Sequence, residues 1–389
     1  MSAGFSFSLF TFHRKEDIHI MKFVCSKVNL LNGLQIVSKA VSNKTTMSIL
    51  ECILIDASKN MIKLTANDME LGIETIIEGE IIEKGIIALE AKIFLDIVRK
   101  LPDNDITIET DSSCKATITC EKAKFNIIGK SGEDFSYLPL IEKNDQIILS
   151  QFTLKEVIRQ TIFSISDNDN NKLMTGELFD INNDTLKVVS LDGHRISIRK
   201  ISLKNSYPAK KVVVPGKTLN EVSKILPGGA EDDVVISFTD KHIVFEFDDT
   251  TVVSRLIEGE YFNIQQMLSS DYETKVTVNR KEFLNCIDRA TLLVKEGDKK
   301  PIIINITDDS MELKISSVIG SMNEDIDINK SGKDLMIGFN PKFLIDALKI
   351  IDDEEVDLYM VNPKAPCFIK NLEESYIYLI LPVNFTTVN

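Results

Sequence analysis

Apolar residues recur at helical spacing near the start of three segments of the chain. In each segment, mostly apolar side chains occupy positions i, i+4, i+7 and i+11, beginning at Leu30, Leu154 and Phe283. This spacing places them on one face of a helix. Start signals with capping-box spacing mark two of the helices: Thr153 with Glu156, and Asn279 with Glu282. We therefore expect an amphipathic helix in each segment.

Alternation of apolar and polar residues predicts strands between these helices. Three similar stretches open at Ile62, Leu186 and Met311, which are 124 and 125 residues apart. Two later stretches, residues 243–257 and 367–383, alternate about a central pair of acidic residues, as β-hairpins do. The strands are thus predicted to be short and antiparallel.

A further helical segment occurs three times with a period of 125 residues. It begins at Lys92 (KIFLDIVRKLP), Lys217 (KTLNEVSKILP) and Lys342 (KFLIDALKIID). Each copy has an acid four residues after the first lysine and a base seven residues after it, and an acidic loop follows. The acids are Asp96, Glu221 and Asp346, and the bases are Arg99, Lys224 and Lys349. Three copies at one period indicate three homologous units.

The fold class that follows is α+β, with three repeated domains that each contain two helices and antiparallel sheets. We expect domains at residues 21–145, 146–272 and 273–389, after a leader or non-core extension at residues 1–20. A chain of 389 residues is long enough to bury three cores.

Composition excludes several classes of protein. The net charge of −14 and pI near 4.9 exclude a uniformly basic nucleic-acid coat, although positive charge can still gather on one surface. Six cysteines without a C-x-x-C pair and four histidines favour neither a metal site nor a redox site. No apolar run reaches the roughly 18–20 residues that span a bilayer. We expect a cytoplasmic protein with no cofactor, metal or membrane.

The repeated bases are the main candidate for a binding surface. Seven residues make nearly two helical turns, so the two bases of each copy project from one side of their helix. In the alternative interpretation the bases have no binding role and lie on solvated helix faces. Their acids would then form intrahelical pairs worth about 0.3–0.5 kcal/mol. Repetition in an acidic chain favours segregated charge instead.

The segment LDGHRI at Leu191 admits an enzymatic and a structural interpretation. Asp192 and His194 suggest a hydrolase, yet no nucleophile motif such as G-x-S-x-G accompanies them. In the structural interpretation, the segment is a turn at the end of a strand, with Gly193 supplying a permissive backbone and Asp192 capping it.

Several motifs together resemble one known family. They are MKF at Met21, TTMSIL at Thr45, LDGHRI at Leu191, VVVPGK at Val212, IGFNPKFL at Ile337 and LPV at Leu381. In this order, over residues 21–385, they resemble the bacterial sliding clamps, the beta subunits of DNA polymerase III. The resemblance implies the DNA clamp fold: a ring of two head-to-tail protomers, with helices lining a hole for duplex DNA and sheets outside.

The resemblance also implies two sites. The first is an apolar pocket for partner peptides, formed by Met174, Leu191, Gly193, His194, Arg195, Ile196, Phe262, Met267, Asn340, Phe343, Leu379, Leu381, Pro382 and Val383. Phe262 stands where the family usually has proline, so we expect a narrower rim and some change in peptide preference. The tail FTTVN extends past the usual end, so we expect the mouth of the pocket to differ as well. The second site faces DNA and combines the six repeated bases with two added positions: Lys44, Lys92, Arg99, Asn168, Lys217, Lys224, Lys342 and Lys349.

The function implied is that of a non-enzymatic processivity factor. A homodimeric ring would encircle double-stranded DNA and tether the catalytic subunit of DNA polymerase III and other proteins with the clamp-binding motif. The chain has no phosphate-binding loop, so an ATP-dependent clamp loader is an implied partner. Two rivals remain: a repeat scaffold that binds only proteins and does not encircle DNA, and a hydrolase centred on Asp192 and His194.

Overall fold

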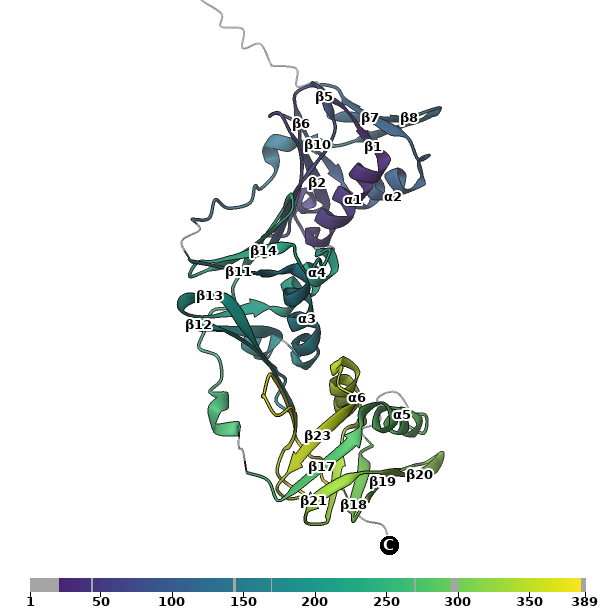
Figure 1. The fold of residues 1–389 in the computed structure, drawn as a ribbon. Coiled ribbons are helices and arrows are strands. Elements are labelled where there is room, and N and C mark those ends of the chain that lie inside the picture. Colours follow the sequence, from purple (N-terminus) through teal and green to yellow (C-terminus); the bar gives the residue numbers. More distant parts are fainter. Residues whose placement is uncertain are drawn as a thin grey trace, which may run out of the picture. The chain divides into compact units, whose positions relative to one another are not determined.

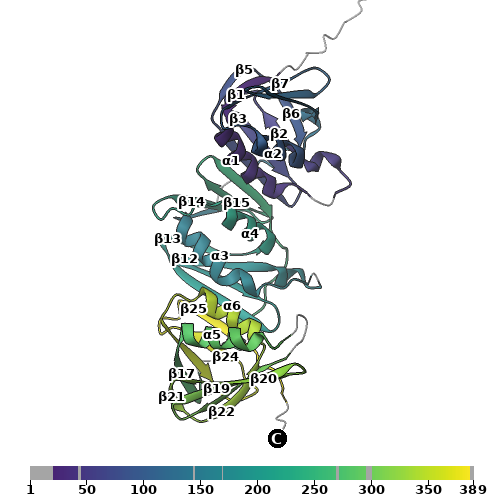
Figure 2. The ribbon, with the colours of Figure 1, turned by 90° about the vertical axis from the view of Figure 1, so that its right-hand side faces the viewer.

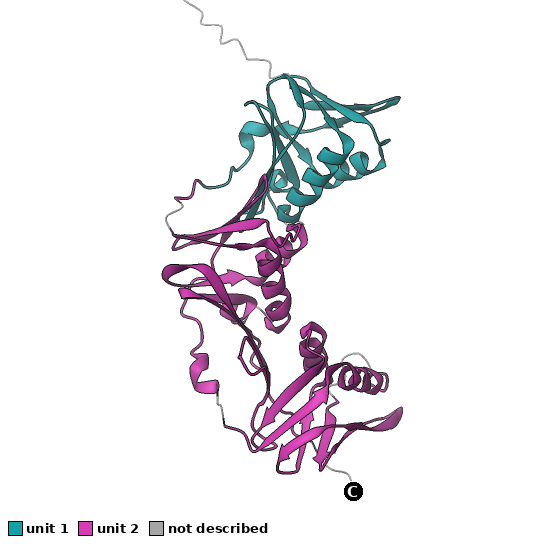
Figure 3. Cartoon of the chain, in the orientation of Figure 1, with its two compact units in different colours: residues 1–139 teal, residues 140–389 magenta. Residues whose placement is uncertain are grey.

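The computed structural model describes residues 21–42, 45–142, 145–168, 170–268, 271–294 and 300–385. The expected extension at residues 1–20 lies outside this described part. The chain divides into two compact units, within residues 1–139 and 140–389 (Figure 3).

Unit 1 contains two antiparallel groups of strands and two helices. The first group has the order β5 (Glu80–Glu83), β1 (Lys22–Ser26), β7 (Asp105–Thr110), β8 (Lys115–Cys120) and β9 (Ala123–Ile128). The second has the order β10 (Lys130–Ser131), β6 (Ile86–Glu90), β2 (Cys52–Asp56), β3 (Ile62–Asn67) and β4 (Leu71–Ile77). The helices are α1 (Lys27–Val37) and α2 (Ala91–Lys100).

Unit 2 contains the second and third repeats. Its first strands have the order β16 (Thr250–Arg255), β15 (His242–Phe247), β14 (Asp233–Phe238) and β11 (Asp145–Ser150). A seven-stranded sheet has the order β12 (Gly176–Leu191), β13 (Arg195–Pro215), β25 (Tyr376–Ile380), β24 (Cys367–Lys370), β23 (Glu355–Met360), β17 (Thr274–Asn279) and β21 (Asn329–Gly332). The last sheet has the order β20 (Gly320–Asp327), β19 (Ser310–Ser317), β18 (Ile302–Thr307) and β22 (Leu335–Phe339).

Four helices belong to unit 2: α3 (Gln151–Thr161), α4 (Gly216–Ile225), α5 (Arg280–Thr291) and α6 (Pro341–Ile350). Figures 1 and 2 show all four on one side of the strands of this unit. Short 3-10 helices connect the larger elements: η1 (Ser38–Ala40), η2 (Ser48–Glu51), η3 (Gly132–Asp134), η4 (Ile162–Ser164), η5 (Lys172–Thr175) and η6 (Ile264–Met267).

The period of 125 residues predicted from the sequence is confirmed by the helices. Helices α2, α4 and α6 begin at Ala91, Gly216 and Pro341, which are 125 residues apart in both steps. The predicted helices around Leu30, Leu154 and Phe283 are α1, α3 and α5. The two acidic hairpin turns are present as well, each with one residue at positive φ, Asp248 at 45° and Glu374 at 50°.

One of the two predicted start signals is wrong. The side chain of Asn279 caps α5 by accepting the backbone N–H of Glu282, as expected. Helix α3, however, starts two residues before Thr153, and the hydroxyl of Ser150 accepts the Thr153 N–H. The capping serine lies directly after the last apolar residues of β11, so the helix begins as soon as the strand ends.

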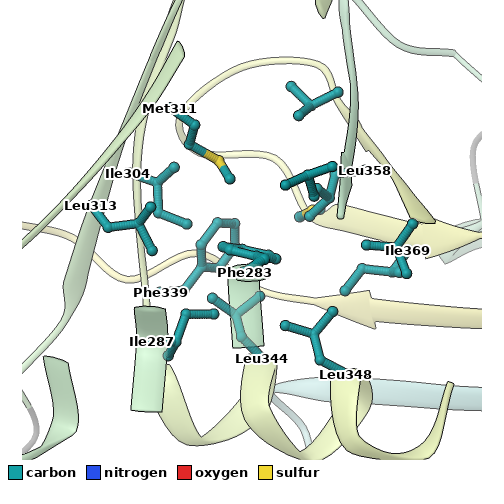
Figure 4. Packing of buried hydrophobic residues seen from close by; sticks show 14 of the residues in the cluster. Phe283, Ile287, Ile304, Met311, Leu313, Phe339, Leu344, Leu348, Leu358 and Ile369 are labelled. Atoms are coloured by element: carbon teal, nitrogen blue, oxygen red, sulfur yellow. The ribbon is translucent and has the colours of Figure 1, made fainter. Parts of the chain in front are cut away.

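Amphipathic helices and both adjoining sheets form the core of the third repeat. Phe283 of α5 and Leu344 of α6 have no exposed surface, and Phe339 of β22 is 1% exposed. Figure 4 shows these side chains directed toward Ile304 and Leu358 from the strands. Burying a large apolar side chain stabilises the fold by roughly 2–3 kcal/mol. The apolar faces of the helices are thus turned to the sheets, and the opposite faces keep their charged residues.

Glu177, the second residue of β12, is a fully buried carboxylic acid. It has no exposed surface, and neither of its carboxylate oxygens has a hydrogen-bond partner in the structure. Burial raises the pKa of Glu177 from 4.5 to about 8, because the ionised carboxylate would lose its hydration. The side chain is therefore protonated at neutral pH.

We predict that Glu177→Gln increases the free energy of unfolding by roughly 1–3 kcal/mol at neutral pH. The unfolded chain releases this proton near pH 4.5 and the native state only near 8, so the native state loses stability as the pH rises through that window. The gain should therefore grow from about pH 5 to 8. Urea unfolding at several pH values measures it, with Glu80→Gln on the exposed strand β5 as control. A gain that does not change with pH would contradict the assignment.

Candidate functional site

A row of apolar side chains crosses strands from two repeats. Leu191 of β12 lies opposite Ile196 of β13, and Ile196 lies opposite Leu379 of β25. Phe368 of β24 and Tyr359 of β23 continue the row. All five are buried and belong to one hydrophobic cluster. Because β13 belongs to the second repeat and β25 to the third, the row joins these repeats.

Residues 256–268, which lead from β16 toward β17, pack on this row. We call the side of the sheet that they cover the connector face. Ile264 is buried in the cluster, and Phe262 and Leu268 are partly buried against it, as is Met174 of η5. Met267 follows on η6 and is 51% exposed. Five predicted pocket residues therefore share one cluster, which contains Met174, Leu191, Ile196, Phe262 and Leu379.

The turn between β12 and β13 has the geometry of the structural interpretation. Gly193 has a φ of 86°, a conformation that side chains other than glycine rarely adopt. One carboxylate oxygen of Asp192 accepts the backbone N–H groups of His194 and Arg195 at 2.9 and 3.0 Å. Asp192 is thus occupied as a cap of the turn.

Arg195 is buried and connects the second repeat to the third. Its guanidinium donates to the Asp192 carboxylate at 3.0 Å, to the Asp346 carboxylate at 2.7 Å and to the carbonyl oxygen of Phe163 at 2.5 Å. It also lies over the ring of Phe343, 4.5 Å from the centroid. The side chain is only 7% exposed. We call this arrangement the Arg195 latch.

A cleft of about 910 Å³ opens beside the Arg195 latch. His194, which is exposed, stacks on Phe343 of α6 with the ring centroids 6.1 Å apart. Asn168 and Lys342 line the same cleft, so candidates for the pocket and for the DNA face meet here. Asn340 caps α6 through its side-chain oxygen, which accepts the Lys342 N–H at 3.1 Å.

The C-terminal segment is fixed beside this region by backbone hydrogen bonds. The Leu381 N–H donates to the His194 carbonyl at 2.9 Å, and the Val383 N–H donates to the Gly338 carbonyl at 2.8 Å. Leu381 and Val383 are 37% and 36% exposed, and Pro382 between them is partly buried. Apolar surface therefore remains accessible next to the cluster.

The six repeated bases all lie on exposed positions of their helices. They are Lys92 and Arg99 on α2, Lys217 and Lys224 on α4, and Lys342 and Lys349 on α6. In two repeats the expected intrahelical pair forms, Arg99 with Asp96 at 3.0 Å and Lys224 with Glu221 at 2.8 Å. In the third repeat Asp346 is bound to Arg195 instead. Lys44 lies outside the described residues.

Comparisons with known proteins match the whole arrangement. Family models of the DNA polymerase III beta subunit match in three parts, the N-terminal domain at residues 21–139, the central domain at 148–263 and the C-terminal domain at 265–384. The beta sliding clamp of Staphylococcus aureus strain Mu50 is 34% identical over 375 residues, 94% of this chain and 99% of that protein.

Solved structures agree. A DNA polymerase III beta subunit from Eubacterium rectale is 76% identical, with a TM-score of 0.92 over 94% of this chain and 100% of that chain. The DNA polymerase sliding clamp of Bacillus subtilis is 34% identical, with a TM-score of 0.91 over 95% and 100%. The chain belongs to the DNA polymerase III beta subunit family. It has the three-domain fold of the sliding clamps.

We next searched the part of the clamp that the structure describes for metal sites, membrane helices and reactive cysteines. No group of three or more His, Cys, Asp or Glu side chains there could hold a metal ion. None of the described helices is long and apolar enough to cross a membrane. The six cysteines are free thiols, and only Cys114 is not buried.

Sequence reasoning missed several residues of this clamp's site. Phe368, Tyr359, Ile264 and Leu268 belong to or pack on the cluster, and Asp346 is part of the Arg195 latch. Alternation marks β24 as a strand but does not say which strands lie beside it. The sequence marked Asp346 only as the third acid of the repeated helix, equivalent to Asp96, and gave no sign that it binds Arg195.

We predict that Asp346→Ala and Asp96→Ala differ in their effect on stability. Loss of the Asp346 carboxylate leaves the buried guanidinium of Arg195 short of one partner and should cost about 1–3 kcal/mol. Loss of Asp96 removes an exposed pair worth less than about 0.5 kcal/mol. Urea unfolding of both variants measures the difference. Equal and small losses would show that the latch does not hold the two repeats together.

Proposed function

We propose that this sliding clamp is a non-enzymatic processivity factor, a homodimeric ring that encircles duplex DNA and tethers the catalytic subunit of DNA polymerase III. The names of its relatives in Staphylococcus aureus and Bacillus subtilis support this function. A polymerase held on the ring rebinds its template before it can diffuse away, because tethering raises its effective concentration. The domains are those expected from the repeats, at residues 21–145, 146–272 and 273–389.

The observation that carries the DNA contact is the placement of the repeated bases. Helices α2, α4 and α6 bury their apolar faces, so each pair of bases is left on the side away from the core. Arg99 and Lys224 pair with acids of their own helices, which reduces the net charge there but leaves both bases on the surface. Such a surface attracts phosphates weakly, as sliding requires. A scaffold that binds only proteins would need no such repetition.

Ring closure is supported by two sheet edges. Strand β9 ends its sheet in unit 1, with Phe125 39% and Ile128 84% exposed. Strand β20 ends its sheet in unit 2, and the turn before it exposes 85% of Val318. Exposed edges invite pairing with another chain.

The charges of these two edges are complementary. Lys122 and Lys124 are exposed at β9, whereas Asp325 and Asp327 are exposed on β20. Pairing β9 of one copy with β20 of a second joins unlike ends, and two such contacts close a ring.

The partners follow from what the chain lacks and what its surface offers. Without a phosphate-binding loop, it depends on an ATP-dependent clamp loader to open the ring around DNA. We place it in the cytoplasm with the replication machinery. The polymerase and other proteins with the clamp-binding motif would dock through short peptides on the connector face.

The peptide pocket is the part of the row where apolar side chains are still accessible. Met174, Phe262 and Leu381 are partly exposed around the buried Leu191 and Ile196. Leucine and phenylalanine side chains of a Q-L-x-L-F type peptide would pack here, and an unbranched methionine can adapt to different ligands. The peptide glutamine would be held near Asn340.

We predict that a Met174→Ala, Leu381→Ala double variant binds such a peptide at least about 10-fold more weakly than the wild type, since few anchors carry the affinity. Isothermal titration calorimetry measures this, against a wild-type affinity on the order of micromolar. The matched control is Met61→Ala, Ile82→Ala, which removes similar exposed side chains from unit 1. Unchanged affinity in the first variant would mean that the peptide binds elsewhere.

A further inference from the structure

A second cavity lies on the connector face, beside the proposed peptide pocket. It has a volume of about 250 Å³. Ile198 and Ile377 form part of its floor, and Lys187, Lys200, Lys370 and Glu374 line it. We call it the lysine cup.

The lysine cup adjoins the pocket through the register of the sheet. Ile198 lies opposite Ile377, just as Ile196 lies opposite Leu379 in the apolar row. Residues two apart on a strand point to the same face and are about 7 Å apart. A peptide seated on Ile196 and Leu379 therefore needs only two or three further residues to reach the cup.

The lining of the cup carries an excess of positive charge. Lys187 and Lys200 lie directly opposite each other on β12 and β13, an arrangement of like charges that destabilises a sheet. Lys370 of β24 lines the same cavity, so the lining contains three lysines and one carboxylate, that of Glu374.

The single carboxylate of the lining is shared between two of the lysines. Glu374 lies 2.6 Å from the ammonium of Lys370 and 3.8 Å from that of Lys200. Lys187 reaches outside the cup to Asp180, at 3.2 Å, and Lys211 lies 3.5 Å from the same carboxylate. The Lys370 side chain is only 15% exposed, so its charge is held within the cavity rather than in open solvent. The cup thus has room and charge for a further carboxylate.

We propose that the lysine cup binds acidic residues that flank the clamp-binding motif of a partner protein. The apolar floor packs against the peptide stem, and the carboxylate shares Lys200 and Lys370 with Glu374. The inference rests on the proposed function, since the peptide pocket places the flank over the cup. Partners with an acidic flank would bind this clamp more tightly than partners with a neutral one.

The test uses five peptides and three proteins. The peptides are the core motif, the motif with an Asp-Glu extension before or after it, and the motif with an Asn-Gln extension before or after it. The proteins are the wild type, a Lys200→Gln, Lys370→Gln variant, and a Lys22→Gln, Lys63→Gln control. The control removes two paired, partly exposed strand lysines from unit 1. Thermal unfolding checks that all three proteins are folded.

Calorimetry should show that the acidic extension on one side binds the wild type and the control about 3- to 10-fold more tightly than the neutral extension. This advantage should vanish in the Lys200→Gln, Lys370→Gln variant and shrink in high salt. The core peptide should bind all three proteins equally.

Four results would overturn the inference. If the core peptide binds but neither acidic extension has an advantage, the cup does not read acidic flanks. The inference also fails if the advantage of the acidic extension survives in the Lys200→Gln, Lys370→Gln variant. It fails as well if this variant loses affinity for a single-stranded oligonucleotide but for no acidic peptide, because that result would assign the cup to nucleic acid. If the core peptide does not bind the wild type at all, the proposed pocket fails first and the inference fails with it.

Discussion

The antiparallel pairing of β13 with β25 is the constraint on which the candidate peptide site depends. The second repeat supplies one part of the apolar row, which ends with Ile196 on β13, and the third repeat supplies the rest, which begins with Leu379 on β25. The backbone hydrogen bonds between β13 and β25 bring the two parts together and fix which residues face the connector. The Arg195 latch adds an ion pair between Arg195, at the start of β13, and Asp346 of α6. The junction of two repeats is therefore part of the site itself.

The same arrangement separates the two candidate binding surfaces. Apolar side chains of unit 2 gather in the sheets and under the helices, whereas the repeated bases remain on the outer faces of the helices. The exposed pairs of Arg99 and Lys224 are weak and screened by salt. In the proposed function, apolar packing holds partner peptides, and dilute positive charge attracts DNA only weakly.

Local features of the fold could be predicted from the sequence. The heptad spacing of Lys92 and Arg99 and its two copies located α2, α4 and α6, because a helix repeats its face within a few residues. The cap of α3 was misplaced, since Thr153 and Ser150 are both good capping residues and only the end of β11 decides between them.

Long-range features could not be predicted in this way. Arg195 and Asp346 are 151 residues apart, and no local pattern indicates that they meet. The pairing of β13 with β25 and the neighbours of Phe368 depend on the order of strands in the sheet. The pocket residues came from family resemblance, and the lysine cup became visible only when β12, β13, β24 and β25 were seen side by side.

Retention on circular DNA tests the central claim, that two copies of the chain close around the duplex. The protein is loaded by its ATP-dependent loader onto a nicked plasmid, transferred to high salt, and separated from free protein before and after a single cut. A closed ring stays with the circle, although salt weakens phosphate contacts strongly, and leaves once the DNA is linear. Equal loss from circular and linear DNA as salt rises would show ordinary surface binding and contradict the account.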